Sequence, residues 1–333
     1  MSRIILPNSL NDDGALSLVR DLNQVIDEPE VSVCFDHLSW VRPFGTLVAA
    51  EAFKDFVFIR KDAGYKTYYE NPANIIAQND GAIGYLKYFG FFQYCGIDIG
   101  EQPNEDYHTK NYLRIQKLEQ KELENNAKNG DWRNRIVSKC EELGEILCED
   151  ISSVNYLEYA FREIIRNVFE HAAISECSLM AQAYKNGMIE IAVADRGRGI
   201  YSTLKDKYNL DKPIDSLFLA LEPGVSMEDV DNSPGEWGNS GFGLYILSNV
   251  GKEYGAFSLL SSGCYLRMYH DDRTILTDEV FYTGTAIKLL VNKADLEYFP
   301  NLRYKLIQEG ELKYKEKYGK EIKASLRSGK SLH

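Results

Sequence analysis

Apolar residues recur at helical spacing over residues 155–172 (NYLEYAFREIIRNVFEHA) and predict an amphipathic helix. The positions expected to pack into a core are Leu157, Ala160, Phe161, Ile164, Ile165 and Val168. Asn155 followed by Glu158 matches an N-cap residue and its capping-box partner, so we expect the helix to begin there.

A polar stripe lies beside this apolar face. Glu163, Asn167 and His171 are spaced at intervals of four, with Glu170 next to them, and about 100° of rotation per residue keeps them on one side of the helix. A solvated helix surface is the usual explanation of such a stripe. Its chemistry also suits a site where an amide oxygen and a carboxylate meet a metal ion and a water molecule. The helix alone does not decide between the two.

Downstream, the hydrophobic period changes to two. Residues 178–184 predict a strand, the Asn-Gly pair at 186–187 a hairpin turn, and the alternation of Ile and Val over 189–193 a return strand. The return strand leads into DRGRG at 195–199. A carboxylate at a strand end can accept a hydrogen bond from an exocyclic amine such as adenine N6, and the glycines permit a tight turn against a flat base. By itself the motif predicts only a turn.

A second glycine-rich segment, GNSGFGL at 238–244, opens an apolar helix. Bare backbone N–H groups at a helix N-terminus suit phosphate oxygens, although a plain glycine turn is the simpler explanation. No Lys-Ser or Lys-Thr follows, so the segment is not a P-loop. Residues 201–237 predict a short helix at 217–221 and a long turn-rich stretch typical of a lid, and residues 284–291 predict a last strand that begins with Gly-Thr.

The first part of the chain alternates between the two periods. We expect helices over 12–26, 45–57 and 82–89, and strands over 31–35 and 65–69. This alternation predicts a small α/β layer domain over residues 1–100. Residues 101–130 are polar and predict a connection that contains a strand at 112–116, and residues 132–147 predict a helix that leads into the second domain.

Composition narrows the function classes. The 333 residues suffice for two domains, and a net charge of −12 argues against a nucleic-acid partner. Six cysteines without a C-x-x-C pair argue against a structural zinc site and a disulfide framework, so we expect buried thiols. No apolar run approaches the length of a membrane span or signal peptide, which predicts no membrane partner and a cytoplasmic location. The basic stretch at 313–330 is expected to be a solvated terminal helix.

In order along the chain, the polar-stripe helix, the strand ending in D-x-G-x-G, the lid, the glycine loop and the Gly-Thr strand resemble the GHKL ATP-binding family (gyrase, Hsp90, histidine kinase, MutL). The resemblance spans roughly residues 130–293. It implies an α/β fold of Bergerat type over 131–295, with a mixed sheet covered by helices on one face, and ATP and Mg²⁺ as cofactors. The chain departs from the family pattern at Asn239, which stands at the place of the first glycine of the loop beside Gly238.

The resemblance also implies a role for each motif residue. Asn167 would ligate Mg²⁺, Glu163 would act as the general base, and Asp195 would bind the adenine amine. The remaining nucleotide-binding positions are Gly197, Gly199, Gly241, Gly243, Leu244 and Thr285. Glu170 and His171 are expected to be structural neighbours.

Residues 35–53 and 82–92 resemble the STAS fold of the anti-anti-sigma-factor family, and the second domain is most similar to the anti-sigma-factor serine kinases. Residues 41–45, which correspond to the phosphorylated position of STAS proteins, hold no Ser or Thr, and the hydroxyl of Thr46 comes only after the glycine, so the phosphorylation switch is expected to be lost. We therefore expect a cytoplasmic ATP-binding switch protein with weak Mg²⁺-dependent ATP hydrolysis, a regulatory domain at 1–100 and a charged tail at 296–333. The alternatives are a serine/threonine kinase acting on a protein partner and an ATP-gated binding module without turnover. ATP or ADP, a protein partner and a possible second copy of the chain are the expected partners.

Overall fold

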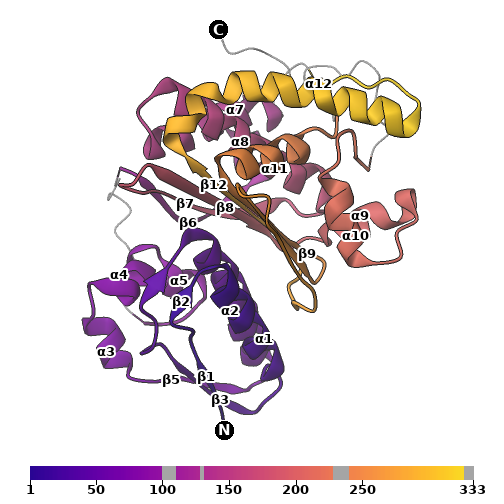
Figure 1. Cartoon of the computed structure of the whole chain (residues 1–333). Coiled ribbons are helices and arrows are strands. Elements are labelled where there is room, and N and C mark those ends of the chain that lie inside the picture. Colours follow the sequence, from indigo (N-terminus) through magenta and orange to yellow (C-terminus); the bar gives the residue numbers. More distant parts are fainter. Residues whose placement is uncertain (100–109, 128–130, 228–239, 326–333) are drawn as a thin grey trace.

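A seven-stranded sheet forms the centre of the computed structural model, which describes residues 1–99, 110–127, 131–227 and 240–325 (Figure 1). Its strands, in spatial order, are β11 (Thr274–Thr277), β10 (Cys264–Tyr269), β9 (Gly255–Ser261), β12 (Thr285–Asn292), β8 (Met188–Asp195), β7 (Glu176–Ala183) and β6 (Tyr112–Glu119). Every neighbouring pair is antiparallel. The α/β class is confirmed, but the expected mixed sheet is wrong. Short turns such as the one between β7 and β8 can join only antiparallel neighbours.

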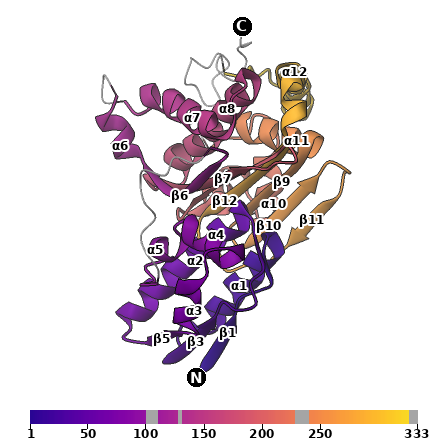
Figure 2. The same cartoon turned by 90° about the vertical axis from the view of Figure 1, so that its left-hand side faces the viewer.

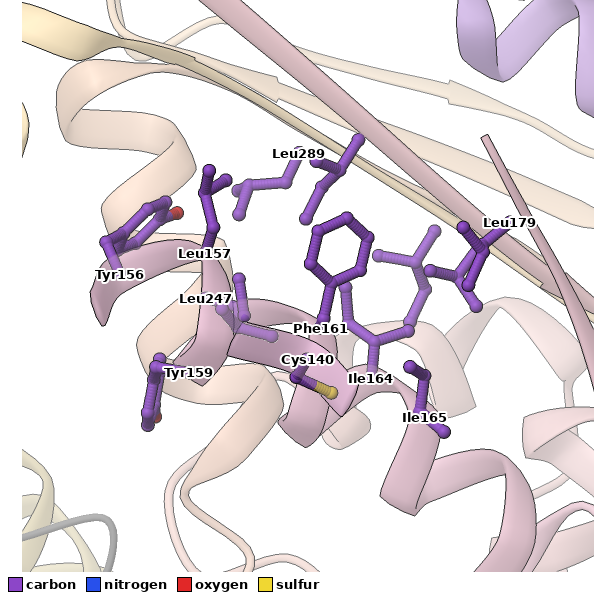
Figure 3. Close-up of a cluster of buried hydrophobic side chains, with 14 of the residues drawn as sticks. Cys140, Tyr156, Leu157, Tyr159, Phe161, Ile164, Ile165, Leu179, Leu247 and Leu289 are labelled. Atoms are coloured by element: carbon purple, nitrogen blue, oxygen red, sulfur yellow. The ribbon is translucent and has the colours of Figure 1, made fainter. Parts of the chain in front are cut away.

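Helices cover one face of this sheet. They are α6 (Gln120–Asn125), α7 (Arg133–Leu147), α8 (Ile151–His171), α9 (Gly199–Tyr208), α10 (Pro213–Ala220), α11 (Gly243–Tyr254), the 3₁₀ helix η1 (Lys293–Tyr298) and α12 (Phe299–Tyr318). Figure 3 shows Leu157, Phe161 and Ile164 of α8 pointing toward the sheet, where Leu179 and Leu289 meet them. The amphipathic pattern of this helix therefore describes its packing correctly.

The start of α8 differs from the prediction. The helix begins at Ile151, and the N-cap is Asp150, whose side chain accepts a hydrogen bond from the backbone N–H of Ser153 at 2.9 Å. Asn155 lies inside the helix. Two cap signals occur close together here, and the one farther upstream is used because it adds another turn of helix.

The N-terminal part has its own small sheets. β1 (Ser2–Ile5), β3 (Glu30–Cys34) and β5 (Lys66–Tyr69) form a parallel three-stranded sheet, and β2 (Ser9–Leu10) pairs with β4 (Trp40–Val41). The helices are α1 (Asp12–Gln24), α2 (Pro43–Asp62), α3 (Pro72–Ala77), α4 (Gly81–Tyr88) and α5 (Phe91–Tyr94). The predicted helices and strands of this region are present, and α2 starts earlier than predicted because Pro43 suits the first helical turn.

Helices α1 and α2 lie against the second face of the seven-stranded sheet (Figure 2), so the expectation of helices on one face only is also wrong. Alternation along the strands separates the two faces. Ile191 and Val193 pack toward α8, whereas Ala192 and Ala194 join the core of the N-terminal part. These small side chains let α2 come close to the sheet. Residues 43–53 of α2 are all buried, as expected for a helix enclosed between two sheets.

Buried charges join the two parts of the chain. Asp12 at the start of α1 contacts Lys288 of β12 and Arg267 of β10, and its carboxylate accepts hydrogen bonds from Tyr265 and Ser258. Burial alone would raise the pKa of Asp12, but Lys288 and the other donors reverse this and hold the pKa below its ordinary value.

Glu190 of β8 forms a second buried link. Its carboxylate accepts a hydrogen bond from the backbone N–H of Phe44 at 3.1 Å, at the start of α2, and lies 3.4 Å from Arg42. A side chain of the large sheet thereby satisfies an N-terminal N–H of a helix from the other part of the chain. The first 99 residues and the large sheet consequently share one continuous core.

Two segments placed outside the predicted domains are part of the packed fold, and the strand predicted at 112–116 is present as β6. β6 falls within the polar stretch 101–130 and is the edge strand of the large sheet, and α12 falls within the tail 296–333 and packs against α11. The expectation about the cysteines is confirmed, because all six are buried thiols. Within the described residues, no helix is both long enough and apolar enough to cross a membrane.

Candidate functional site

A cavity that is open at its mouth lies between α8, the ends of β8 and β12, α9 and the start of α11. The candidate residues that line it are Glu163, Asn167, Asp195, Gly199, Gly241, Gly243, Leu244 and Thr285. Gly197 does not line the cavity, but its backbone N–H donates a hydrogen bond to Asp195. Segments separated by more than a hundred residues thus meet in one cavity that combines apolar lining with a few polar groups, as small-molecule sites do.

Strand geometry explains how Asp195 reaches the cavity. It continues the row of Ile189, Ile191 and Val193 on the α8 side of β8, and it lies opposite Thr285 of β12 in the strand register. Its carboxylate accepts a hydrogen bond from the backbone N–H of Gly197 at 2.7 Å. A side chain at position 197 would collide with Ala172, because a Cβ would stand 2.3 Å from its carbonyl oxygen.

Burial raises the pKa of Asp195 to about 6, although hydrogen bonds from the backbones of Gly197 and Thr285 act in the opposite direction. The Asp195 side of the cavity is built from further polar groups. The Thr285 hydroxyl lies 3.0 Å from Ser261 Oγ, which in turn accepts a hydrogen bond from the N–H of Ile200 at 2.9 Å. Gly199 adopts φ +75°, a conformation in which glycine is favoured. This end of the cavity is a rigid, largely desolvated acceptor site.

Glu163 and Asn167 of the polar stripe lie toward the start of α11, whereas His171 lies toward Asp195. Glu163 is only 7% exposed, and its Oε1 lies 3.3 Å from Nη2 of Arg162. A Cβ on Gly243 would stand 2.6 Å from Glu163 Oε2, so the absence of a side chain at 243 lets α11 begin directly against this carboxylate. The buried amide nitrogen of Asn167 has no hydrogen-bond partner among the described residues. A buried polar atom in this state is a natural contact for a ligand.

The glycine loop is held by its neighbours. Gly241 has φ +68°, and its carbonyl oxygen accepts a hydrogen bond from the N–H of Gly224 at 3.1 Å. Residues 238 and 239, including the departure from the family pattern at Asn239, lie outside the described residues, as do positions 228–237 of the predicted lid. Positions 201–227 hold α9 and α10, and α9 was not predicted.

Several lining residues were not assigned a role from the sequence. Arg166 is buried beside Asn167 and forms hydrogen bonds of 3.0 and 3.1 Å to Glu170. Burial raises the pKa of Glu170, partly offset by Arg166. Glu170 and His171 both line the cavity. Their places in and beside the polar stripe could have identified them from the sequence. Nothing in the local sequence marks Ser325, which also lines the cavity.

Metal-binding capacity is limited to individual side chains. Within the described parts of the chain, no group of three or more His, Cys, Asp or Glu side chains could hold a metal ion. Asn167 with Glu163 offers oxygen donors for a hard cation, but a ligand would have to complete its coordination.

The arrangement combines a desolvated carboxylate at one end, a second carboxylate and an amide at the other, and a helix N-terminus beside them. It can therefore bind an elongated ligand that carries a hydrogen-bond donor at one end and oxyanions at the other. Neither the known protein-family models nor the curated protein sequences contain a match for this chain.

Proposed function

We propose that this protein binds ATP in the cavity between α8 and α11, and that the nucleotide state, changed by slow Mg²⁺-dependent hydrolysis, alters contacts within the chain or with a protein partner. One observation carries the proposal: Asp195, which pairs with Thr285, and Glu163 and Asn167, which lie beside the start of α11, all line a single cavity. That arrangement is the one expected from the resemblance to the GHKL ATP-binding family.

The adenine would lie at the Asp195 end. An ionised carboxylate accepts a hydrogen bond from the N6 amine, and a pKa of about 6 leaves Asp195 mostly ionised at neutral pH. Because this carboxylate is 4% exposed and the surrounding lining is largely apolar, water competes weakly for the same hydrogen bond. Thr285 and Gly199 would border the base.

The phosphates would lie against the start of α11. Among the described residues no side chain caps this helix, so its first N–H groups are available to phosphate oxygens, and the helix dipole favours negative charge there. Gly241 and Gly243 keep side chains away from that surface. Arg166 lines the cavity, and its guanidinium group would offset part of the phosphate charge.

Mg²⁺ fits this site as part of a nucleotide complex. The amide oxygen of Asn167 is a hard donor of the kind that Mg²⁺ accepts, and phosphates and water would supply the other ligands. When bound, the ion would neutralise phosphate charge.

Hydrolysis would use Glu163 as the general base. The carboxylate is fixed between Arg162 and the start of α11, and it would accept the proton of a water molecule placed near the terminal phosphate. The ion pair with Arg162 also favours the alternative of an ATP-gated binding module without turnover, because it occupies one oxygen of the proposed base.

Contacts between the parts of the chain supply a route for the switch. Arg196, next to Asp195, forms a salt bridge to Asp55 of α2. Ser178 donates hydrogen bonds to Glu51 of α2 and to the carbonyl oxygen of Ala194. A ligand that moves the end of β8 would therefore change the contacts of Asp55 and Glu51 and so shift α2.

The test is a titration of the full chain with ATP, ADP and GTP, with and without Mg²⁺, followed by calorimetry, together with an assay for released phosphate. We expect ATP to bind more tightly than GTP, because guanine presents a carbonyl oxygen to Asp195. Asn167→Ala should lose the Mg²⁺-dependent part of the affinity. Asp206→Asn, an exposed acid on α9, is the matched control and should bind as the wild type does. Equal affinity for ATP and GTP, or no binding of either, would refute the proposal.

A serine/threonine kinase that acts on a partner is the second candidate. The observation behind it is that a serine hydroxyl, that of Ser325, lines the cavity at which phosphate is expected, so the site admits an acceptor of this chemistry.

A further inference from the structure

The end of the described chain turns back toward the cavity. α12 ends at Tyr318, and Gly319 adopts φ +65°, which reverses the direction of the backbone. We call residues 320–325 the returning segment. The prediction of a solvated terminal helix is wrong for this segment, because α12 has already ended and Ile322 and Ser325 are 3% and 2% exposed.

Specific contacts fix the returning segment. Lys323 forms an ion pair with Glu311 of α12 at 2.8 Å, and the backbone N–H of Ala324 donates to the same carboxylate at 3.3 Å. Ile322 packs so closely over Gly224 that a Cβ there would stand 2.7 Å from its Cδ1. Glu311 therefore holds the backbone just before Ser325.

These contacts place Ser325 at the phosphate end. Gly224, under Ile322, forms the backbone hydrogen bond to Gly241 of the glycine loop. Ser325 lines the same cavity as Glu163 and Gly243. The Asp195 end, by contrast, is built from β8, β12 and the start of α9.

We propose that Ser325 is the phosphoryl acceptor of this protein, modified in cis by the ATP bound in its own cavity. The proposal rests on the proposed ATP-binding function and names the substrate of that site. Ser325 Oγ would form a bond to the γ-phosphorus as the bond from that phosphorus to the β,γ-bridging oxygen breaks. ADP would leave with the bridging electrons, and the hydroxyl proton would pass to the Glu163 carboxylate and then to water.

Other hydroxyls line the cavity, and the structure distinguishes them. Thr203 donates its hydrogen bond to the carbonyl oxygen of Gly199, on the Asp195 side, and the backbone of Ser226 is held by Tyr208. Ser240 precedes Gly241 within the glycine loop itself, where it would lie alongside the phosphates. Ser325 instead enters from a separate segment that is anchored outside the cavity.

The test incubates the purified full chain with γ-labelled ATP and Mg²⁺ at several protein concentrations and maps the label by peptide mass spectrometry. We expect one phosphoryl group on Ser325, incorporated with a rate constant that does not depend on protein concentration. Ser325→Ala should lose at least tenfold of the label while keeping the ATP affinity, and Ser325→Thr should retain part of it. Glu311→Gln, which weakens the anchor, should slow labelling without changing affinity. Ser152→Ala, an exposed serine on α8, is the matched control.

A chain that binds ATP but incorporates no label, or carries the label on Ser226 or Ser240, overturns this inference and leaves the proposed function intact. Labelling whose rate constant rises with protein concentration overturns the step in cis. A chain that binds no ATP overturns the proposed function and this inference together.

Discussion

The two faces of the seven-stranded sheet bury polar groups in different surroundings. On the face toward α1 and α2, the carboxylates of Asp12 and Glu190 meet donors from the other part of the chain. On the face toward α8, Asn167 keeps a buried nitrogen without a partner among the described residues, and Asp195 is desolvated beside a cavity. The paired groups hold the parts of the chain together, whereas Asn167 and Asp195 border a cavity and are in a position to contact a ligand.

The largest effect on stability should come from removing the buried ion pairs on the face toward α1 and α2. Asp12→Ala leaves Lys288 and Arg267 buried without their common carboxylate, and we expect a loss of about 3–5 kcal/mol in the free energy of unfolding, measured with urea. Asp13→Ala, the exposed neighbour, should cost less than about 1 kcal/mol. Similar values for the two variants would show that the Asp12 cluster does not join the parts of the chain.

The next effect concerns the cavity face and should appear in turnover rather than stability. Glu163→Gln removes the proposed base but keeps its shape beside Gly243, so ATP affinity should change little while phosphate release falls about 10²-fold or more. Calorimetry and a phosphate assay on the same preparation separate the two quantities. Unchanged phosphate release would exclude Glu163 as the base.

The pH dependence of nucleotide affinity tests Asp195 on its own. Binding requires the carboxylate, and its pKa is about 6, so affinity should fall by up to about tenfold per pH unit below 6 and level off above 7. Asp195→Asn should bind weakly at every pH and lose this dependence. A wild-type affinity that stays constant between pH 5 and 8 would rule out a contact between this carboxylate and the base.

The same raised pKa predicts an opposite trend for the protein without nucleotide. The folded state takes up a proton on Asp195 near pH 6, whereas the unfolded chain does so near about 3.9. The contribution of this group to stability is therefore fully present below about pH 4 and is lost as the pH rises through 6. The difference between wild type and Asp195→Asn in urea unfolding at several pH values isolates this contribution.

The smallest effect should come from the link between the faces. Asp55→Ala removes the partly exposed salt bridge to Arg196, and we expect ATP affinity to change by less than about fivefold, equivalent to at most about 1 kcal/mol. Hydrogen exchange of α2 with and without ATP is the sharper measurement, because the variant should reduce the difference between the two states. An undiminished difference would place the coupling elsewhere, for example at Glu51.

Periodicity predicted most of the helices and strands because it records which side of an element is buried. Asp195 continues the alternation of 189–193 onto the α8 side of the sheet, and residues of the D-x-G-x-G motif, the glycine loop and α8 line one cavity. The strand directions, by contrast, were inferred from the family resemblance rather than from the turns, and the antiparallel sheet corrected them.

The sequence does not show that the second face of the sheet is covered, because the residues on that face look like those of a solvent-exposed face. Ala192, Ala194 and Lys288 alternate with large apolar residues and look like the solvent side of a half-buried strand. Only the arrival of α2, from more than a hundred residues upstream, makes them interior. The same holds for Ser325, whose basic surroundings predict a solvated segment and whose burial depends on Glu311 and Gly224.

The position of β12 in the sheet determines when the sheet can be completed during synthesis. This strand lies between β8 and β9 at the middle of the sheet, yet of the seven strands of this sheet it comes last in the sequence and is synthesised last. Until then α2 has no complete surface to cover, and β8 presents an open edge during synthesis. Truncations before residue 292 should therefore give aggregated chains rather than a free N-terminal part, and chaperone demand should be concentrated late in translation.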